Sequence, residues 1–536
     1  MKVCAAIVML HEAGRDNSAT RRFRDRPVLD WTRARLSSAG GITATRIVCF
    51  DDQLESVHDA VDDPAAIFSA GPRSWLPAIE AMAVARRWSD GWRGGLLNSS
   101  EYDLGCDTPT LLRLTTSLDA DAVLSINASS GLIDPVLIDR LITQLEDNAD
   151  LEMTFLPAAP GLGAMLLRRP LLARLAGANL TPGRLLSYQP DAPMRDPLAS
   201  PSCVAVPLAV ARSARSFKLD SQSQIARLGG SLMSLNGELM SSSAERVIAS
   251  GGQLGAEPLP REIVLELTTR RATSPVFSAA GRSEVVRSDM TLAVARTIFE
   301  QAAIRDDVRI TLAGVGDPLL HDQCSEIIAA AREAGVCSVG VETDLLPDDP
   351  GAIERIIEAG IEVVSVHLPA ALPATYARLM GADAMTQVIA NIQRLASARA
   401  TAGRSVPIIA PTFVKSTLNL AELEGWYDQW LRAVGTAVIV APTTFGGLIA
   451  DVSVGDMSPP ARVPCRRLGS RMTILSDGRV VRCEEDAAGT SSMGRIGEQT
   501  IEEIWQGAFQ RLRVLHASNQ WQTCGDCARC REWHRP

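Results

Sequence analysis

The segment 463–486, VPCRRLGSRMTILSDGRVVRCEED, decides how the end of this chain folds. Its part RMTILSDGRVVRC predicts a β-hairpin that turns at Asp477 and Gly478, because Asp-Gly between alternating runs is a strong hairpin signal. Cys465 stands a few residues before this hairpin and Cys483 closes it, a C-x17-C spacing. The hairpin therefore presents one thiol from each end to a third segment.

Three further cysteines follow near the end of the chain, Cys524, Cys527 and Cys530, at C-x2-C-x2-C spacing. Thiolates repel one another, so five cysteines in so short a module require either disulfides or a metal. In a reducing cytoplasm a metal is favoured. Soft sulfur ligands select zinc or an iron-sulfur cluster, and spacing alone does not choose between them.

The module from 463 to 533 resembles the SPASM domain that follows the barrel of radical SAM enzymes, also through MGRIGEQTIEEIW, LRVLH and CARCREW. The resemblance implies one auxiliary [4Fe-4S] cluster, held by Cys465, Cys483, Cys527 and Cys530. Cys524 is an extra thiol whose spacing to Cys527 makes it an alternative ligand. A structural zinc site is the other interpretation of the same cysteines.

Six apolar runs between residues 258 and 450 alternate with helix-like segments such as DQCSEIIAAAREAG. The runs are IVLELT, DVRITLAGVG, SVGVET, IEVVSVHL, VPIIAPTF and TAVIVAPTTF. This alternation predicts a parallel β/α barrel or partial barrel. The region also resembles the radical SAM barrel, through PREIVLELTTR, TLAGVGDPLLH, VETDLL, EVVSVHL and ATYARLMGADAMTQVIANIQRL.

The barrel departs from that family at one decisive place, the loop after its first strand. Radical SAM enzymes carry C-x3-C-x2-C there, and the aligned positions in this chain are Arg271, Pro275 and Ser278. None of the three is a normal cluster ligand, so the resemblance implies no route to reductive cleavage of S-adenosylmethionine. Cys324 and Cys337 are a helical segment apart and do not rebuild the triad, and we expect buried thiols there.

A glycine-containing turn follows the second strand of the predicted barrel. It resembles the GGEP element that contacts the methionine end of the cofactor, at Gly314, Gly316, Asp317 and Pro318. Its backbone N–H groups could still accept a ligand. We favour a tight turn retained for folding, because short glycine motifs are weak evidence. His367 is interpreted as a loop or core histidine rather than a ligand or base.

The first part of the chain resembles a nucleotidyltransferase of the GT-A type, through CAAIVML, RPVLDWTRARL and ITATRIVCF. In that family a Gly-rich loop with basic residues holds the nucleotide phosphates. Here the loop at 11–27 has one glycine, Gly14, and its candidate phosphate-binding residues are Arg15, Arg21 and Arg22. Arginine is not a simple replacement for lysine at such a site.

The segment LSINASSGLIDPVLIDRLI resembles the metal-binding turn of the same family. Asn127, Ala128, Ser129 and Ser130 fill this turn, so the expected carboxylate is missing and magnesium would be poorly held. Asp134 is predicted to be a helix N-cap, since Pro135 follows it. Asp220 is either a surviving metal ligand or a cap or turn residue.

Composition narrows the classes of protein to consider. With 46% hydrophobic and 21% charged residues the chain is ordinary for a soluble protein. A net charge of -9 and a pI of about 5.4 argue against a nucleic-acid or anionic-membrane binder, so we expect small molecules or proteins as partners. The opening MKVCAAIVML predicts a buried strand, and no apolar run is long enough to cross a bilayer. We expect a cytoplasmic protein.

At 536 residues the chain exceeds what one core supports, and we predict an α/β protein of several domains. The predicted parts are a Rossmann-like nucleotidyltransferase fold at 1–230, a Gly- and Ser-rich linker at 231–257, the partial barrel at 258–450 and the cysteine module at 451–536.

Three functions follow from these observations. The first is an iron-sulfur protein with degenerate catalytic sites, non-catalytic or dependent on a partner, acting in glycan or cofactor modification. The second is an active radical SAM oxidoreductase whose cluster ligands lie elsewhere. The third is a nucleotidyl or sugar-phosphate transferase that uses Arg21 or Arg22 on phosphate.

Overall fold

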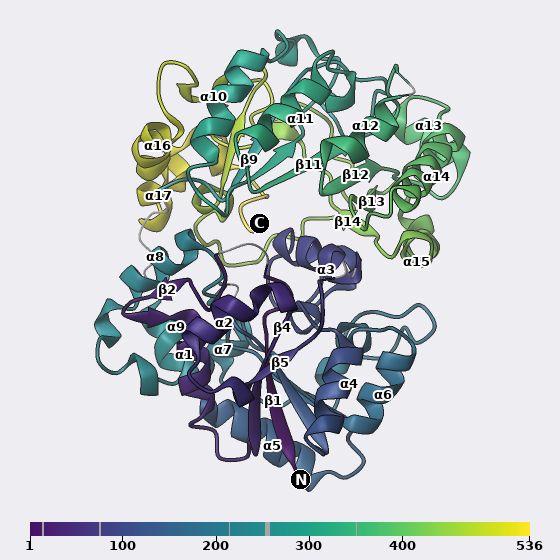
Figure 1. Ribbon diagram of the computed structural model, residues 1–536. Coiled ribbons are helices and arrows are strands. Elements are labelled where there is room, and N and C mark those ends of the chain that lie inside the picture. The colour runs from purple at the N-terminus through teal and green to yellow at the C-terminus, as the bar shows by residue number, and fades with distance from the viewer. Residues whose placement is uncertain (13–15, 74–76, 214, 252–257, 350, 536) are drawn as a thin grey trace. The chain divides into compact units, whose positions relative to one another are not determined.

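The chain divides into two compact units, Met1–Gly255 and Ala256–Pro536, in a computed structural model (Figure 1). The structure describes residues 1–12, 16–73, 77–213, 215–251, 258–349 and 351–535. Each unit has its own sheet and its own hydrophobic core. Two cores agree with the length of the chain, which is more than a single core usually supports.

The sheet of the first unit has six strands in the order β5-β4-β1-β6-β8-β7. The strands are β1 (Val3–Val8), β4 (Ala44–Cys49), β5 (Ile67–Ser69), β6 (Ala122–Asn127), β7 (Met153–Phe155) and β8 (Met165–Arg168). The completely buried β1 lies in the middle and is parallel to both β4 and β6, whereas β8 is antiparallel to both of its neighbours. The predicted α/β layer with a mostly parallel sheet is therefore present. A separate short pair, β2 (Arg22–Phe23) and β3 (Arg26–Pro27), precedes the first helix.

Nine α-helices belong to the described part of the first unit. They are α1 (Val28–Leu36), α2 (Leu54–Ala60), α3 (Pro77–Arg87), α4 (Thr108–Ser117), α5 (Pro135–Asp147), α6 (Arg169–Gly177), α7 (Leu208–Arg212), α8 (Gln222–Ser231) and α9 (Ala244–Ser250). Asp134 is the N-cap of α5, as predicted, and its carboxylate accepts hydrogen bonds from the backbone N–H of Val136 and of Ala244.

The described part of the predicted linker packs against the core of the first unit. It contains α9, and Leu235, Leu239 and Val247 lie in the first unit's core. The fully buried Arg35 donates hydrogen bonds to the carbonyl oxygens of Leu239, Met240 and Ser242, at 2.7, 2.8 and 2.7 Å. Residues 252–257 lie outside the described residues.

The sheet of the second unit has nine strands in the order β14-β13-β12-β11-β10-β9-β15-β16-β17. Its first six in the chain are β9 (Glu262–Leu265), β10 (Arg309–Leu312), β11 (Ser338–Thr343), β12 (Val363–His367), β13 (Ile408–Val414) and β14 (Val438–Val440). All six are parallel, so the strands predicted between 258 and 450 are confirmed. Because the end strands do not pair, this sheet is open.

The cysteine-rich segment continues the same sheet. The strand β15 (Arg471–Ile474) runs parallel to β9, and β16 (Arg479–Val481) and β17 (Ser492–Arg495) follow antiparallel. The predicted hairpin is confirmed, with Gly478 at φ 83° in the turn. The module is thus continuous with the barrel strands through β9.

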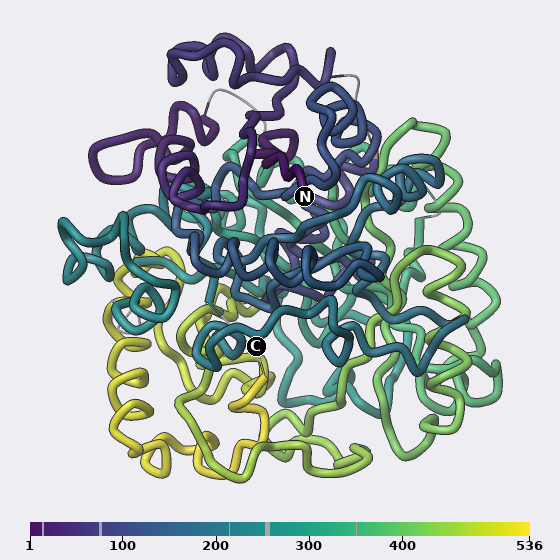
Figure 2. The backbone as a smooth tube through the Cα atoms, turned by 90° about the horizontal axis from the view of Figure 1, so that it is seen from below, coloured from purple at the N-terminus to yellow at the C-terminus, as the bar shows by residue number. Residues whose placement is uncertain are grey.

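Helices cover one face of this second sheet. They are α10 (Leu292–Ala302), α11 (Cys324–Glu333), α12 (Ala352–Ala359), α13 (Pro373–Met380), α14 (Met385–Thr401) and α15 (Leu423–Val434), followed by α16 (Ile501–Ile504) and α17 (Gln510–Ala517). Figure 1 shows α10, α11 and α12 along the outer side of the strands, and the last two helices form the yellow coil at the left of Figure 2. Among the described residues, no helix combines the length and hydropathy of a bilayer-spanning segment.

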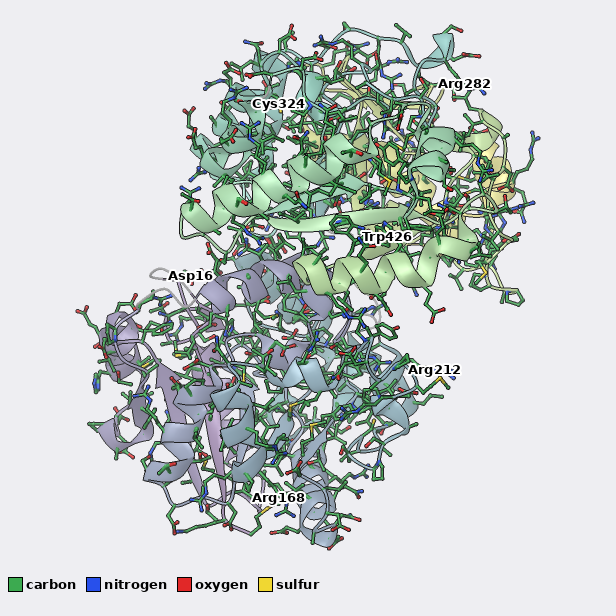
Figure 3. All side chains as sticks on the ribbon, turned by 90° about the vertical axis from the view of Figure 1, so that its right-hand side faces the viewer. Asp16, Arg168, Arg212, Arg282, Cys324 and Trp426 are labelled. Carbon is green, nitrogen blue, oxygen red and sulfur yellow. The ribbon has the colours of Figure 1, made fainter. Side chains whose placement is uncertain are left out.

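Trp426 of α15 anchors this helix to the sheet (Figure 3). Its side chain is completely buried, and its ring centroid lies 5.0 Å from that of Phe413 on β13. We expect Trp426→Ala to destabilise the second unit by about 3–5 kcal/mol, because it removes a large buried side chain and leaves a cavity. Chemical denaturation followed by circular dichroism measures the loss.

The matched control is Leu420→Ala, in the 3-10 turn just before the same helix. Leu420 is 47% exposed, so its truncation is expected to change stability by less than about 0.5 kcal/mol. Equal losses for both variants would contradict the anchoring role of Trp426.

Candidate functional site

A cavity of about 600 Å³ lies against the inner face of the second sheet. Side chains alternate along a strand, so Glu262 and Val264 of β9 line the cavity while Ile263 and Leu265 join the hydrophobic core. The other barrel strands contribute Thr311, Glu342, His367, Val414 and Val440, and β15 contributes Arg471 and Thr473. The sheet therefore curves around the cavity, at the place where the sequence predicts the mouth of a partial barrel.

Arg271 takes the first of the three positions aligned with cluster cysteines. Its guanidinium is almost buried and donates two hydrogen bonds to the Asp344 carboxylate, from Nε at 2.9 Å and from Nη2 at 2.5 Å. Ser278 also lines the cavity, whereas Pro275 is absent from its lining. Within the described part of the chain, no cysteine lines this cavity.

Asp344 is the centre of a buried polar network. Burial alone would raise the pKa of this carboxyl group, but Arg271 and His367 outweigh burial and hold the pKa well below its usual range. The hydroxyl of Thr273 donates to the same carboxylate at 2.5 Å. The Arg271–Asp344 pair is therefore ionised, and each member compensates the other's buried charge.

Asp317, in the predicted glycine-containing turn, contacts Asp344 and the residue before it. Its carboxylate accepts hydrogen bonds from the Thr343 hydroxyl and the Asp344 backbone N–H, both at 2.8 Å. It is also the N-cap of a short 3-10 helix that begins at Pro318. Burial and the charge of Asp344 raise the pKa of Asp317. This residue therefore holds the end of β11 in place.

The two glycines of the turn fit tightly against the first barrel strand. A Cβ atom at Gly316 would lie 2.2 Å from the carbonyl oxygen of Thr268, and one at Gly314 would lie 2.7 Å from Cγ of Glu266. Close packing thus accounts for glycine at both positions, against the backbone of Thr268 at Gly316 and against the Glu266 side chain at Gly314. All of Gly314, Gly316 and Asp317 line the cavity, but Pro318 does not. A cofactor-binding role for this turn stays a prediction.

Two cavity residues were missed or undervalued in the sequence. His367, interpreted as a loop or core histidine, faces the cavity with Nδ1 3.2 Å from Nη2 of Arg271 and 3.3 Å from Oδ1 of Asp344. Glu342 lies two residues before Asp344 on the same side of β11. The signal in the sequence was the acidic alternation in VETD, which places both carboxylates on one face of a strand.

Most other charges of the cavity are paired. Glu262 accepts from Arg309 at 3.0 Å and from Arg471 at 3.2 Å, and these two guanidiniums together with Thr311 lower its pKa to about 2 against the effect of burial. Glu266 pairs with Arg287 at 2.6 and 2.9 Å. Ion pairs therefore hold the charged side chains on this part of the cavity wall in place.

A second cavity, of about 360 Å³, belongs to the cysteine module. Cys483, Cys527 and Cys530 line it. The Cys465 thiol lies close enough to Cys527 and Cys530 to raise the pKa of both, in addition to burial. Cys524 does not line the cavity, and its thiol contacts the carbonyl oxygen of Gln520 at 3.8 Å. The four cysteines of the predicted ligand set are therefore neighbours, with Cys524 at the side.

The surroundings of these thiols are charged. Arg482 donates to Sγ of Cys527 at 3.8 Å, and the backbone N–H of Glu532 donates to Sγ of Cys530 at 3.2 Å. Burial, and after it Glu484 and Glu485, raise the pKa of the Cys483 thiol well above its ordinary value. Within the residues that the structure describes, all eleven cysteines are free of disulfides, and no three His, Cys, Asp or Glu side chains converge on a single metal position.

The donor set fits an iron-sulfur cluster. Such a cluster is held by four thiolates, which lie around a body larger than one metal ion. Here three of the thiols line one cavity, and N–H donors reach two of the sulfur atoms. A mononuclear zinc site instead gathers four donors at about 2.0–2.3 Å from one ion.

One cluster of polar side chains in the first unit lies beside the end of β6. Lys218 is at the centre, with Nζ 2.8 Å from Asp220 and 3.6 Å from Glu101. Burial opposes its charge, but Asp220 and Glu101 raise the pKa of Lys218 above its usual value. Asn127, the last residue of β6, donates to the Glu101 carbonyl oxygen at 3.3 Å. An ammonium group therefore sits beside Asp220, the candidate metal ligand.

Of the candidate phosphate-binding arginines, the structure describes Arg21 and Arg22, which donate to different backbone carbonyl groups. Arg21 is buried and donates to the carbonyl oxygens of Asp16 and Leu219, at 2.8 and 3.3 Å. Arg22 is exposed and donates to the carbonyl oxygen of Asp25. Arg15 lies outside the described residues, and the phosphate role of all three stays a prediction.

Residues 465–531 match the SPASM family, an iron-sulfur cluster-binding domain. An uncharacterized protein of Treponema pallidum (strain Nichols) is 23% identical over 289 residues, covering 50% of this chain and 78% of that protein. The structure of Streptococcus suis SuiB bound to precursor peptide SuiA is 11% identical, with a TM-score of 0.42, over 56% of this chain and 74% of SuiB. A cytidylyltransferase from Leptospira borgpetersenii serovar Hardjo-bovis is 12% identical, with a TM-score of 0.32, over 46% of this chain and 93% of its own. TM-scores this low do not establish a shared fold.

The buried ion pair of the barrel leads to a stability prediction. We expect Arg271→Ala to destabilise the second unit by about 3–5 kcal/mol, because it leaves the Asp344 carboxylate buried without its counter-ion. Arg296→Ala is the control, since Arg296 pairs with Glu333 at 3.6 Å on the surface, where both side chains are more than half exposed. Its loss should cost at most about 1 kcal/mol.

Urea denaturation of the two variants and the unaltered protein measures both effects. A loss below about 1 kcal/mol for Arg271→Ala would mean that water compensates Asp344 and that the pair is not buried in solution.

Proposed function

We propose that this chain is an iron-sulfur protein of the radical SAM/SPASM type whose single [4Fe-4S] cluster is bound in the C-terminal module and whose barrel does not cleave S-adenosylmethionine. The observation that carries the proposal is Arg271, which fills the position of a cluster cysteine with a guanidinium bound to Asp344. A guanidinium cannot ligate iron. The chemistry of the barrel therefore differs from that of radical SAM enzymes.

The match of residues 465–531 to the SPASM domain supports the cluster. We assign Cys465, Cys483, Cys527 and Cys530 as its ligands, because three of them line one cavity and the fourth lies next to two of these. Cys524 also lies near Cys527, but it is left out because it does not line this cavity and its thiol contacts the carbonyl oxygen of Gln520. The cluster, when bound, supplies one-electron redox chemistry or stabilises the module.

The proposed role in the cell is non-catalytic or dependent on a partner, in the modification of a glycan or a cofactor. The acidic net charge supports a small molecule or a protein as partner rather than a nucleic acid. The free cysteines support a reducing compartment, because disulfides form mainly in oxidising ones. We therefore propose that the protein is cytoplasmic. Nucleotidyl transfer by the first unit is not part of the proposal, because Lys218 already neutralises Asp220.

Anaerobic reconstitution with iron and sulfide tests the cluster. We expect about four irons per chain, the content of one [4Fe-4S] cluster, together with its visible absorption. Cys483→Ala should lose most of this iron because it removes a ligand. Cys324→Ala should keep it, since Cys324 begins α11 and does not line the cysteine cavity.

Two results would contradict the proposal. About one zinc and no iron per chain, with tetrahedral sulfur coordination, would replace the cluster by a structural zinc site. About eight irons per chain, or 5'-deoxyadenosine formed from S-adenosylmethionine by the reduced protein, would favour an active radical SAM enzyme with a second set of cluster ligands.

A further inference from the structure

Glu342 differs from every other carboxylate in the barrel cavity. Within the described part of the chain, the others either pair with a guanidinium or accept hydrogen bonds from nearby hydroxyl or backbone N–H groups, as Asp317 and Asp486 do. Glu342 has no ion-pair or hydrogen-bond partner there, and its side chain lines the cavity with its surface exposed. An exposed carboxylate without a partner on a cavity wall is accessible to a cationic ligand.

The electrostatic surroundings of Glu342 favour a positively charged ligand. Burial raises the pKa of Glu342, and the carboxylates of Glu484 and Glu262 raise it further, while His367 and Arg471 lower it. Arg471 is already bound to Glu484 at 2.7 Å and to Glu262 at 3.2 Å. The cavity is lined by eight carboxylates and four guanidiniums, and Arg287 and Arg309 pair with two of these carboxylates from outside the lining. Carboxylates therefore still outnumber guanidiniums, and a cationic ligand improves the charge balance.

The adjacent strand β12 places a second polar side chain, His367, near Glu342. Glu342 of β11 is directly opposite Ser365 of β12, and His367 lies two residues further along the same face. Nδ1 of His367 is held by Arg271 and Asp344, which leaves Nε2 as the free ring nitrogen. A ligand at Glu342 therefore lies close to the imidazole ring of His367 on the adjacent strand.

The part of the cavity wall formed by β13 and β14 is apolar. Val414 of β13 and both Ile439 and Val440 of the edge strand β14 line it, and the last two are each 39% exposed. Large exposed aliphatic side chains inside a cavity favour contact with an apolar group of a ligand. One wall thus favours a cation and the other an apolar body.

We propose that the barrel cavity binds a small organic cation, with its ammonium or guanidinium group against Glu342 and its apolar part on the β14 wall. The volume of about 600 Å³ is within the range of small-molecule sites. This inference rests on the proposed function in one respect, that no cluster occupies the mouth of the barrel. It names the class of ligand that the barrel takes instead.

The test compares two probes of the same shape, 2-phenylethylamine, which is charged at neutral pH, and 2-phenylethanol, which is not. Binding of each to the full-length reconstituted protein is measured by calorimetry. We expect the amine to bind at least about tenfold more tightly, because a hydrogen bond to a charged group contributes roughly 1.5–3 kcal/mol. Glu342→Gln should reduce this preference to within about twofold.

Binding of the alcohol by Glu342→Gln at unchanged affinity shows that the variant still forms the cavity. The matched control is Glu300→Gln, on the exposed side of α10, which should keep the full preference for the amine. Equal affinity of the two probes for the unaltered protein would overturn the inference, and so would a preference that survives Glu342→Gln or that falls equally in Glu300→Gln.

The iron content and the assay for 5'-deoxyadenosine are measured on the same samples. A protein with about four irons and no cleavage but no preference for the amine retains the proposed function and loses only this inference. A protein that cleaves S-adenosylmethionine loses the proposed function, whichever probe it binds.

Discussion

The buried ion pair between Arg271 and Asp344 is the constraint on which the second unit depends. A buried charge is tolerated only when it is compensated, so the arginine on the loop after β9 and the aspartate after β11 have to be retained together. The pair joins the two segments across β10, and Thr273 and His367 complete it. Because a guanidinium fills this position, the barrel mouth presents a fixed salt bridge between the loop after β9 and the end of β11.

The continuous sheet links this mouth to the cysteine module. Since β15 pairs with β9, Arg471 lies beside Glu262 and holds both that carboxylate and Glu484, the residue after Cys483. The two cavities also share part of their lining, at Pro442, Thr443, Glu485, Asp486 and Arg535. A change of charge on a group bound by the cysteines would therefore act on carboxylates that the barrel cavity also uses.

Local patterns predicted what depends on local physics. The six apolar runs became parallel strands, the Asp-Gly pair became the hairpin turn, and Asp134 capped its helix, because each is decided by a few neighbouring residues. The pairing of β15 with β9 left no such signal, since it joins residues more than two hundred positions apart. For the same reason His367 and Glu342 could be assigned to strands but not to a shared cavity, which exists only once the sheet has curved. The Gly- and Ser-rich segment at 231–257 was similarly undervalued, because the packing of Leu235 and Leu239 is a tertiary effect.

In the first unit, as in the second, a basic side chain compensates the charge of neighbouring carboxylates. Lys218 places an ammonium between Asp220 and Glu101, as Arg271 places a guanidinium against Asp344. In each unit a basic side chain of the chain itself compensates the carboxylates at the carboxyl ends of parallel strands, the edge at which α/β sheets bind ligands. An internal cation costs no binding step and does not dissociate, so it stabilises the fold permanently. In the first unit, Lys218 also occupies the position beside Asp220 that a metal ion would need. In the second unit, Glu342 is the cavity carboxylate that remains open to an external cation.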